Sequence, residues 1–199
     1  MINDSIGTGS VRSHFFFRYC FVRLNLLNPN GCHRNIMEPN EAVIHRFYSA
    51  FQRLDAAGMN ACYSDDIIFS DPVFGLLRGE EARSMWEMLC TNARDFSLTF
   101  SNIQLLDEEY ATCNWTATYT FSKTGRRVVN SIKAFMKLQD GQIVEHSDAF
   151  RLSKWIGQAL GWKGRLFGWM GWMQRKVQQS ARKSLLQYIS KKAVTNGNA

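Results

Sequence analysis

The segment YSDDIIFSDPVFG, residues 63–75, contains the first change from helix to strand in this chain of 199 residues. Its polar run Ser64-Asp65-Asp66 is typical of the end of a helix, and the alternation from Ile68 to Asp71 is typical of the start of a strand. Asp71 is followed by Pro72, and Asp-Pro commonly opens a turn. The segment therefore predicts a helix end, a strand and a turn.

Helical patterns lie on both sides of this segment. Asn40 is a candidate N-cap for apolar residues that recur at helical spacing over 43–54. Asp55 can cap a second, short helix that ends at the polar run. Gly79 opens a third helix, with Glu80 and Glu81 in the first turn, where the helix dipole favours acidic residues.

The spacing of apolar residues changes after Cys90 from about 3.6 to about 2. Four strands are predicted from this spacing, over residues 96–103, 110–121, 128–138 and 142–150. Asp140-Gly141, between the last two, is a strong hairpin signal. Helices followed by an antiparallel meander predict an α+β fold with the helices packed on one face of a curved sheet.

The net charge of +7 is unevenly distributed along the chain. Residues 1–36 hold four basic side chains and one acidic, residues 37–150 hold 10 basic and 16 acidic, and residues 151–199 hold 10 basic and none acidic. The basic pI therefore reflects the C-terminal segment and not the middle of the chain. Because a run of charge is usually a solvated helix face, a nucleic-acid partner is not favoured.

The C-terminal segment combines this charge with four of the six tryptophans, Trp155, Trp162, Trp169 and Trp172, and ends in a basic helix over 174–189. One interpretation is a lid or brace that packs on the barrel mouth. The other is an amphipathic surface that meets a membrane or a partner. The acidic middle of the chain offers the basic segment an internal partner, which favours the brace.

Three segments are predicted. The start of the chain, 1–36, has no helix or strand periodicity and is interpreted as a disordered leader or a start-site artefact, with Met37 as the true start. The folded domain is expected over 37–152, and the basic Trp-rich helical extension over 153–199.

The five cysteines are odd in number and form neither a C-x-x-C pair nor a metal-binding spacing. This pattern favours a reducing compartment, and we expect a cytoplasmic protein with no metal or other cofactor. No apolar run has the roughly 18–20 residues that a membrane-spanning helix needs.

The order of the elements, together with three local motifs, resembles the nuclear transport factor 2-like superfamily. The motifs are the segment 63–75, the helix start RGEEA at 78–82, and DGQIVEHSDAF at 140–150. Within the superfamily the chain is most similar to ketosteroid isomerase and the SnoaL-like enzymes, which include polyketide cyclases and limonene epoxide hydrolase. The resemblance implies a cone-shaped barrel of three N-terminal helices on a curved, mostly antiparallel sheet, and dimerisation through that sheet. It does not specify a reaction, because this fold carries many functions.

For Asp71 the resemblance implies a catalytic role, since the Asp before Pro is the general base of ketosteroid isomerase. A carboxylate can do this work where it faces an apolar pocket that excludes water. The alternative is that Asp71 only caps the turn at Pro72, and both interpretations stay open.

Other elements of the related mechanisms are missing. The isomerase uses a Tyr on the first helix and a protonated Asp on the next-to-last strand, and gap-free counting puts Phe47 and Lys133 at these positions. Lys133 could itself stabilise a negative oxygen as a cation. Asp148 lies near the last-strand Asp of the epoxide hydrolase, but the Arg-x-Asp of that enzyme reads Asn114-Trp115-Thr116 here. Neither mechanism is expected.

On the last predicted strand His146, Asp148 and Phe150 share one face. If that face lines the cone, Asp71, Lys133, His146 and Asp148 could meet there, and Asp71, His146 and Asp148 are the candidate catalytic residues. The alternatives are a satisfied His-Asp pair and a plain ion pair of Lys133 with Asp71. The candidate ligand-binding residues are Lys133, Phe69, Trp115, Phe150 and Tyr48, although aromatic residues such as these, Trp86, Tyr119 and Phe135 are most often core.

Two functions follow from the sequence. One is a SnoaL-like protein that binds a small apolar molecule in a conical pocket and performs isomerase-, cyclase- or hydrolase-type acid/base chemistry at Asp71 without a cofactor. The other is a non-catalytic ligand-binding or dimerising module with a filled or vestigial pocket.

Overall fold

The computed structural model describes residues 38–197. Two helices come before the first strand in the chain, and a third lies between the second and third strands. They are α1 (Pro39–Gln52), α2 (Ala56–Asn60) and α3 (Glu80–Asn92). The predicted leader at 1–36 lies outside the described residues. Asn40 is not the N-cap of α1, because the helix already starts at Pro39, a residue that suits a first turn. The Asp55 side chain caps α2 by accepting from the Gly58 N–H at 2.9 Å, as predicted.

The polar run 64–66 is part of a strand and does not end a helix, which corrects the sequence interpretation. Strand β1 extends over Tyr63–Asp71. Arg83 on α3 donates to the carbonyl of Ser64 and to the carboxylate of Asp65, both within 3 Å. Pairing with the sheet and these contacts to Arg83 outweigh the local turn preference of Ser and Asp.

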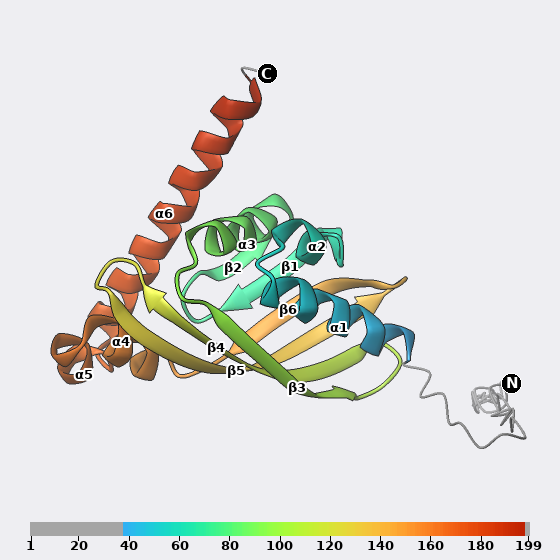
Figure 1. The fold of residues 1–199 in the computed structure, drawn as a ribbon, viewed down its shortest axis with the longest axis horizontal. Helices are drawn as coiled ribbons and strands as arrows, with labels where there is room; N and C mark the ends of the chain where they lie inside the picture. Colours follow the sequence, from blue (N-terminus) through green and yellow to red (C-terminus); the bar gives the residue numbers. More distant parts are fainter. Residues whose placement is uncertain (1–37, 198–199) are drawn as a thin grey trace, which may run out of the picture. The chain divides into compact units, whose positions relative to one another are not determined.

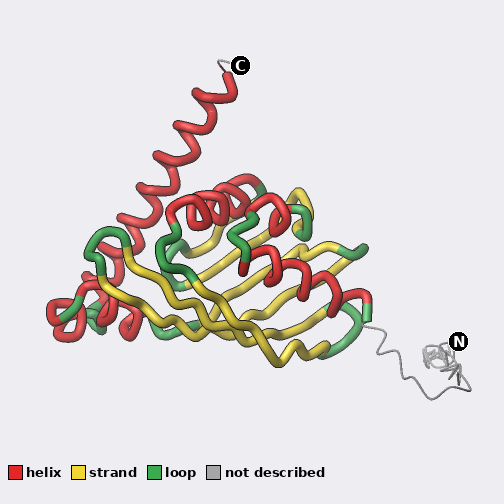
Figure 2. Tube along the Cα trace, viewed as in Figure 1, coloured by secondary structure: helices red, strands yellow, loops and turns green. Residues whose placement is uncertain are grey.

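Six strands form one curved sheet in the order β2-β1-β6-β5-β4-β3 (Figure 2). The strands after β1 are β2 (Gly75–Arg78), β3 (Ser97–Leu105), β4 (Tyr110–Phe121), β5 (Arg126–Gln139) and β6 (Gln142–Ala149). All neighbours are antiparallel except β1 and β6. The hairpin at Asp140-Gly141 is present, and both residues have positive φ, 50° and 76°. The short edge strand β2 was not predicted.

The helices α1 to α3 cover one face of the sheet, and the core lies between these helices and the sheet (Figure 1). Side chains alternate along β5, where Ile132, Ala134 and Met136 are buried. Phe135, expected in the core, is 44% exposed because its odd position points to the other face. The sheet is thus closed by helices on one side.

Three helices follow the sheet: α4 (Leu152–Leu160), α5 (Trp162–Phe167) and α6 (Gly171–Gly197). The helix α4 is held to the sheet by Gln158, whose side chain bonds both the N–H and the carbonyl of Val129. The helix α6 contains the predicted basic helix, 174–189, and is longer than predicted at both ends. None of the helices in the described part of the chain is long and apolar enough to cross a membrane.

The three cysteines in the described residues, Cys62, Cys90 and Cys113, are buried and free. Burial raises the pKa of each thiol, to about 11 for Cys90 and Cys113. They behave as small core side chains. The cytoplasmic location stays a prediction.

Candidate functional site

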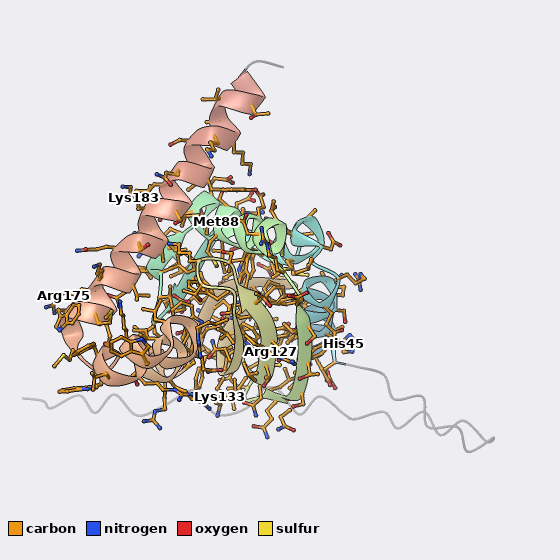
Figure 3. All side chains as sticks on the ribbon, turned by 60° about the vertical axis from the view of Figure 1, so that its left-hand side comes forward. His45, Met88, Arg127, Lys133, Arg175 and Lys183 are labelled. Atoms are coloured by element: carbon orange, nitrogen blue, oxygen red, sulfur yellow. The ribbon has the colours of Figure 1, made fainter. Side chains whose placement is uncertain are left out.

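A cavity of about 810 Å³ lies between the sheet, α3 and the C-terminal helices. Most of its wall is apolar, and Met88, which Figure 3 labels on α3, is part of that wall. Three of the five predicted ligand-binding residues, Phe69, Trp115 and Phe150, also line it. The polar side chains that line it from the strands include Asp71, Tyr119 and Asp148.

Asp71 ends β1 at the cavity wall. Its Oδ1 accepts the backbone N–H groups of Val73 and Phe74, at 2.9 and 2.5 Å. The pKa of Asp71 is raised to about 7, mainly by burial and also by the nearby Asp148, while the N–H groups of residues 73–75 oppose the rise. Both sequence interpretations thus have a structural counterpart, since this carboxylate closes a turn and also lines an apolar cavity.

A chain of hydrogen bonds connects Asp148 to the core. Trp86 Nε1 donates to the Tyr63 hydroxyl at 2.9 Å, and that hydroxyl lies 2.7 Å from His146 Nδ1. His146 Nε2 lies 3.1 Å from Asp148 Oδ1, which also accepts from Trp115 Nε1 at 3.1 Å. We call these five residues the buried relay. The polar atoms named here are paired with one another, as is usual for buried polar groups.

The relay assigns the histidine tautomer. Because the Tyr63 oxygen already accepts from Trp86, its own proton is directed to His146 Nδ1. His146 Nε2 then carries the proton and donates it to Asp148. His146 and Asp148 share the inward face as predicted, but the side chain of His146 is 0% exposed and lies behind Asp148 without lining the cavity. His146 therefore orients Asp148.

Tyr119 was assigned to the core from sequence, yet it lines the cavity. Its hydroxyl accepts from Trp155 Nε1 of α4 at 2.7 Å, which leaves its own proton free to be donated. Burial and the Asp71 charge raise the pKa of Tyr119 and keep it protonated. The alternation along β4 places Tyr119 on the same face as Trp115, and this pattern could have predicted its position at the cavity. The pattern could not predict its hydrogen bond to Trp155 on α4.

The C-terminal helices supply one wall of the cavity, in agreement with the predicted brace at the barrel mouth, although the sequence did not specify which of their residues line it. Met173 and Val177 of α6 line it, as does Trp155 of α4. The same helix α6 contacts the turn after Asp71: Gln178 donates to the carbonyl of Pro72 at 3.0 Å, and Arg182 donates to that of Phe74 at 2.8 Å. The turn is thus held by Asp71 from one side and by α6 from the other.

Two predicted site residues lie elsewhere. Lys133 does not line this cavity, because it lies at an outward position of β5, where its ammonium is 5.3 Å from the Phe135 ring and the residue is exposed (Figure 3). Tyr48 is fully buried on α1 and does not line the cavity. Its hydroxyl has no hydrogen-bond partner among the described residues. Phe47 packs on Tyr63 in the core, so neither it nor Lys133 offers a donor to the cavity.

Metal-ligating side chains do not gather in residues 38–197, where no three His, Cys, Asp or Glu residues could hold one ion. The polar side chains of the cavity in this part of the chain carry carboxyl, hydroxyl, carboxamide, indole N–H and ammonium groups.

Solved structures share this fold. A nuclear transport factor 2-like protein of unknown function from Burkholderia pseudomallei aligns with a TM-score of 0.54 and 19% identity, over 62% of this chain and 98% of that chain. A putative polyketide cyclase from Xanthomonas campestris gives 0.53 and 18%, over 62% and 98%. An epoxide hydrolase from M. tuberculosis gives 0.52 and 18%, over 65% and 93%. At these identities the likeness shows the fold alone.

The sequence was also compared with curated proteins and with protein families. No curated protein matches it. The family model of the SnoaL-like domain matches residues 44–146, just over half of the chain. This range begins within α1, ends within β6 and includes all the elements between them. The chain therefore belongs to the SnoaL-like domain family, within the nuclear transport factor 2-like superfamily.

Proposed function

We propose that this protein binds a small apolar organic molecule in the cavity and moves a proton on it with Asp71. The observation that carries the proposal is a carboxyl group in an apolar cavity with its pKa raised to about 7. A general base works best when its pKa lies near the ambient pH. Asp71 then takes a proton from a carbon next to a carbonyl, and returning it elsewhere gives an isomerase-type outcome.

Tyr119 and Asp148 support this chemistry from other strands. The negative oxygen that forms on the substrate needs a hydrogen-bond donor, and the Tyr119 O–H has no acceptor among the described residues. Asp148 keeps its place through His146 and Trp115. Its nearby charge makes Asp71 a stronger base.

The test is hydrogen–deuterium exchange at the carbon next to the carbonyl of simple apolar ketones, such as tetralones, followed by NMR in deuterated buffer. We expect the protein to accelerate the exchange and Asp71→Asn to reduce it by about a hundredfold or more, the usual size of a general-base contribution. Asp66→Asn is the matched control, because Asp66 is exposed on the same strand. Exchange that Asp71→Asn leaves unchanged would contradict the role of Asp71.

A second candidate function is ligand binding without catalysis. It is favoured by the turn at Asp71, where the two backbone N–H bonds to Oδ1 give this residue a structural task. A melting-temperature screen separates the two functions. Ligands that stabilise the wild type and Asp71→Asn equally, with no ketone exchange in either, indicate a binding module. The predicted homodimer is also part of this proposal, and light scattering tests it.

A further inference from the structure

Four large apolar side chains are exposed together at α5 and the start of α6. They are Trp162 at 70%, Leu166 at 56%, Trp169 at 67% and Trp172 at 48% exposure, and we call them the tryptophan patch. Since an aromatic side chain can bury ~150–250 Å², the patch offers on the order of a few hundred Å² of apolar surface. This is the size at which an exposed patch indicates an interaction site.

The indoles are held outward by bonds within the same segment. Trp169 Nε1 donates to the carbonyl of Leu166 at 3.0 Å, and Trp172 Nε1 lies 3.2 Å from Met170 Sδ. Because the polar atoms of these two rings are already paired nearby, the surface they present is apolar. These bonds hold the Trp169 and Trp172 rings against their own segment.

Basic side chains lie next to the patch in the sequence. Lys163 lies with its ammonium 5.6 Å from the Trp162 ring, and Arg165, Arg175 and Lys176 are exposed close to it in sequence. Figure 3 shows Arg175 extending from the side of α6 that faces away from the barrel. None of these four forms a salt bridge within the described residues, and residues 151–199 contain no Asp or Glu.

Indole rings next to Lys and Arg are suited to the headgroup layer of a bilayer, where one end of a side chain is wet and the other apolar. Anionic lipid headgroups would neutralise the basic residues. A second copy that docked through the same patch would place Lys163 and Arg165 against like charges. We propose that the tryptophan patch docks the protein on the surface of a membrane that contains anionic lipid.

The tryptophan patch lies close to the cavity, which suits the proposed binding of an apolar ligand there. Lys163, next to Trp162, and Lys176 line the same cavity as Asp71. A molecule that dissolves in the bilayer would therefore meet the cavity close to the docked surface.

The test is co-sedimentation of the full chain with vesicles of phosphatidylcholine, with and without phosphatidylglycerol. We expect binding only to vesicles with phosphatidylglycerol. Trp162→Ser/Trp169→Ser/Trp172→Ser and Lys163→Glu/Arg165→Glu should each weaken it by about tenfold or more. Leu106→Ser and Lys133→Glu, exposed positions on loop and sheet, are the matched controls and should bind as the wild type does. Circular dichroism and melting verify that each variant is folded.

Three outcomes overturn the proposal. The wild type could remain in the supernatant with both vesicles. The triple Trp variant could bind as well as the wild type, which would place the contact elsewhere in the chain. Light scattering without vesicles could also give a dimer that the triple Trp variant converts to a monomer, and the patch would then be an interface between copies. None of these outcomes depends on the ketone exchange at Asp71.

Discussion

The carboxylate of Asp71 both closes a turn and lines an apolar cavity, so its ionisation has a cost that can be measured. Its pKa is about 7 in the folded protein, against the ordinary 3.8. The folded state thus holds this proton more tightly than the unfolded state, and the stability linked to it is complete below about pH 4 and declines as the pH rises through about 7.

Asp71→Asn is expected to remove this decline. The amide oxygen can still accept from Val73 and Phe74, and no charge is buried. In urea unfolding at a series of pH values, the variant should gain stability relative to the wild type between about pH 4 and pH 7, by on the order of a few kcal/mol, and the difference should then level off. A difference that is the same at every pH would mean that Asp71 is not the titrating group, and exposed Asp66→Asn should show no such trend.

The buried relay makes a second prediction at the residue scale. Tyr63→Phe leaves the Trp86 N–H and His146 Nδ1 without their partner, which we expect to cost about 1–3 kcal/mol of unfolding free energy. Tyr48→Phe is the matched control in the same core, because the Tyr48 hydroxyl is buried and has no partner in the described structure. It should be neutral or stabilising. Equal losses in the two variants, measured by urea unfolding, would refute the relay.

At the scale of elements, α6 restrains the turn that follows Asp71. Arg182 donates to the carbonyls of Phe74 and Leu76, and Arg182→Ala removes both bonds. We expect a loss of about 1–2 kcal/mol and faster hydrogen exchange at the amides of Val73 and Phe74. Lys183→Ala is the control on the next residue, which extends away from the barrel (Figure 3). Unchanged exchange at the turn in Arg182→Ala would show that α6 does not hold it.

Some elements could be predicted from the sequence and others could not, for local physical reasons. Strand β4 is predicted at its observed bounds, because apolar and polar residues alternate along it. Strand β2 has four residues, too few for a period to appear. The run 64–66 was predicted to end a helix because its preference for turns is local, whereas Arg83, which holds it in a strand, is about twenty residues away.

At the scale of the whole molecule, the basic segment forms salt bridges with the acidic middle of the chain through one residue among those described. Lys192 binds Glu80 at 3.0 Å and Glu87 at 2.8 Å, both on α3. These are the salt bridges that the tail forms with α3 within residues 38–197, and Glu80 has its pKa lowered mainly by the Lys192 contact. The charge argument for a brace therefore has a narrow basis.

Lys192→Gln should loosen the C-terminal half of α6. Partly exposed ion pairs contribute little, so we expect about 0.5–1 kcal/mol, seen as faster hydrogen exchange after residue 185. The wild type in about 1 M salt should resemble the variant, because salt screens the pairs. Lys191→Gln, an exposed neighbour, is the control, and an equal effect there would show that net charge and not the pairs with α3 holds the helix.

The sequence by itself determined the fold class, the inward face shared by His146 and Asp148, and the place of Asp71 at a turn, because periodicity and turn chemistry act over a few residues. Tertiary structure alone decided which polar groups share the cavity. It paired Tyr119 with Trp155, placed Lys133 on the opposite face, and decided which residues of α6 line the cavity. These contacts join residues far apart in the chain, and local patterns, which extend over a few residues, do not show which surfaces meet once the helices pack.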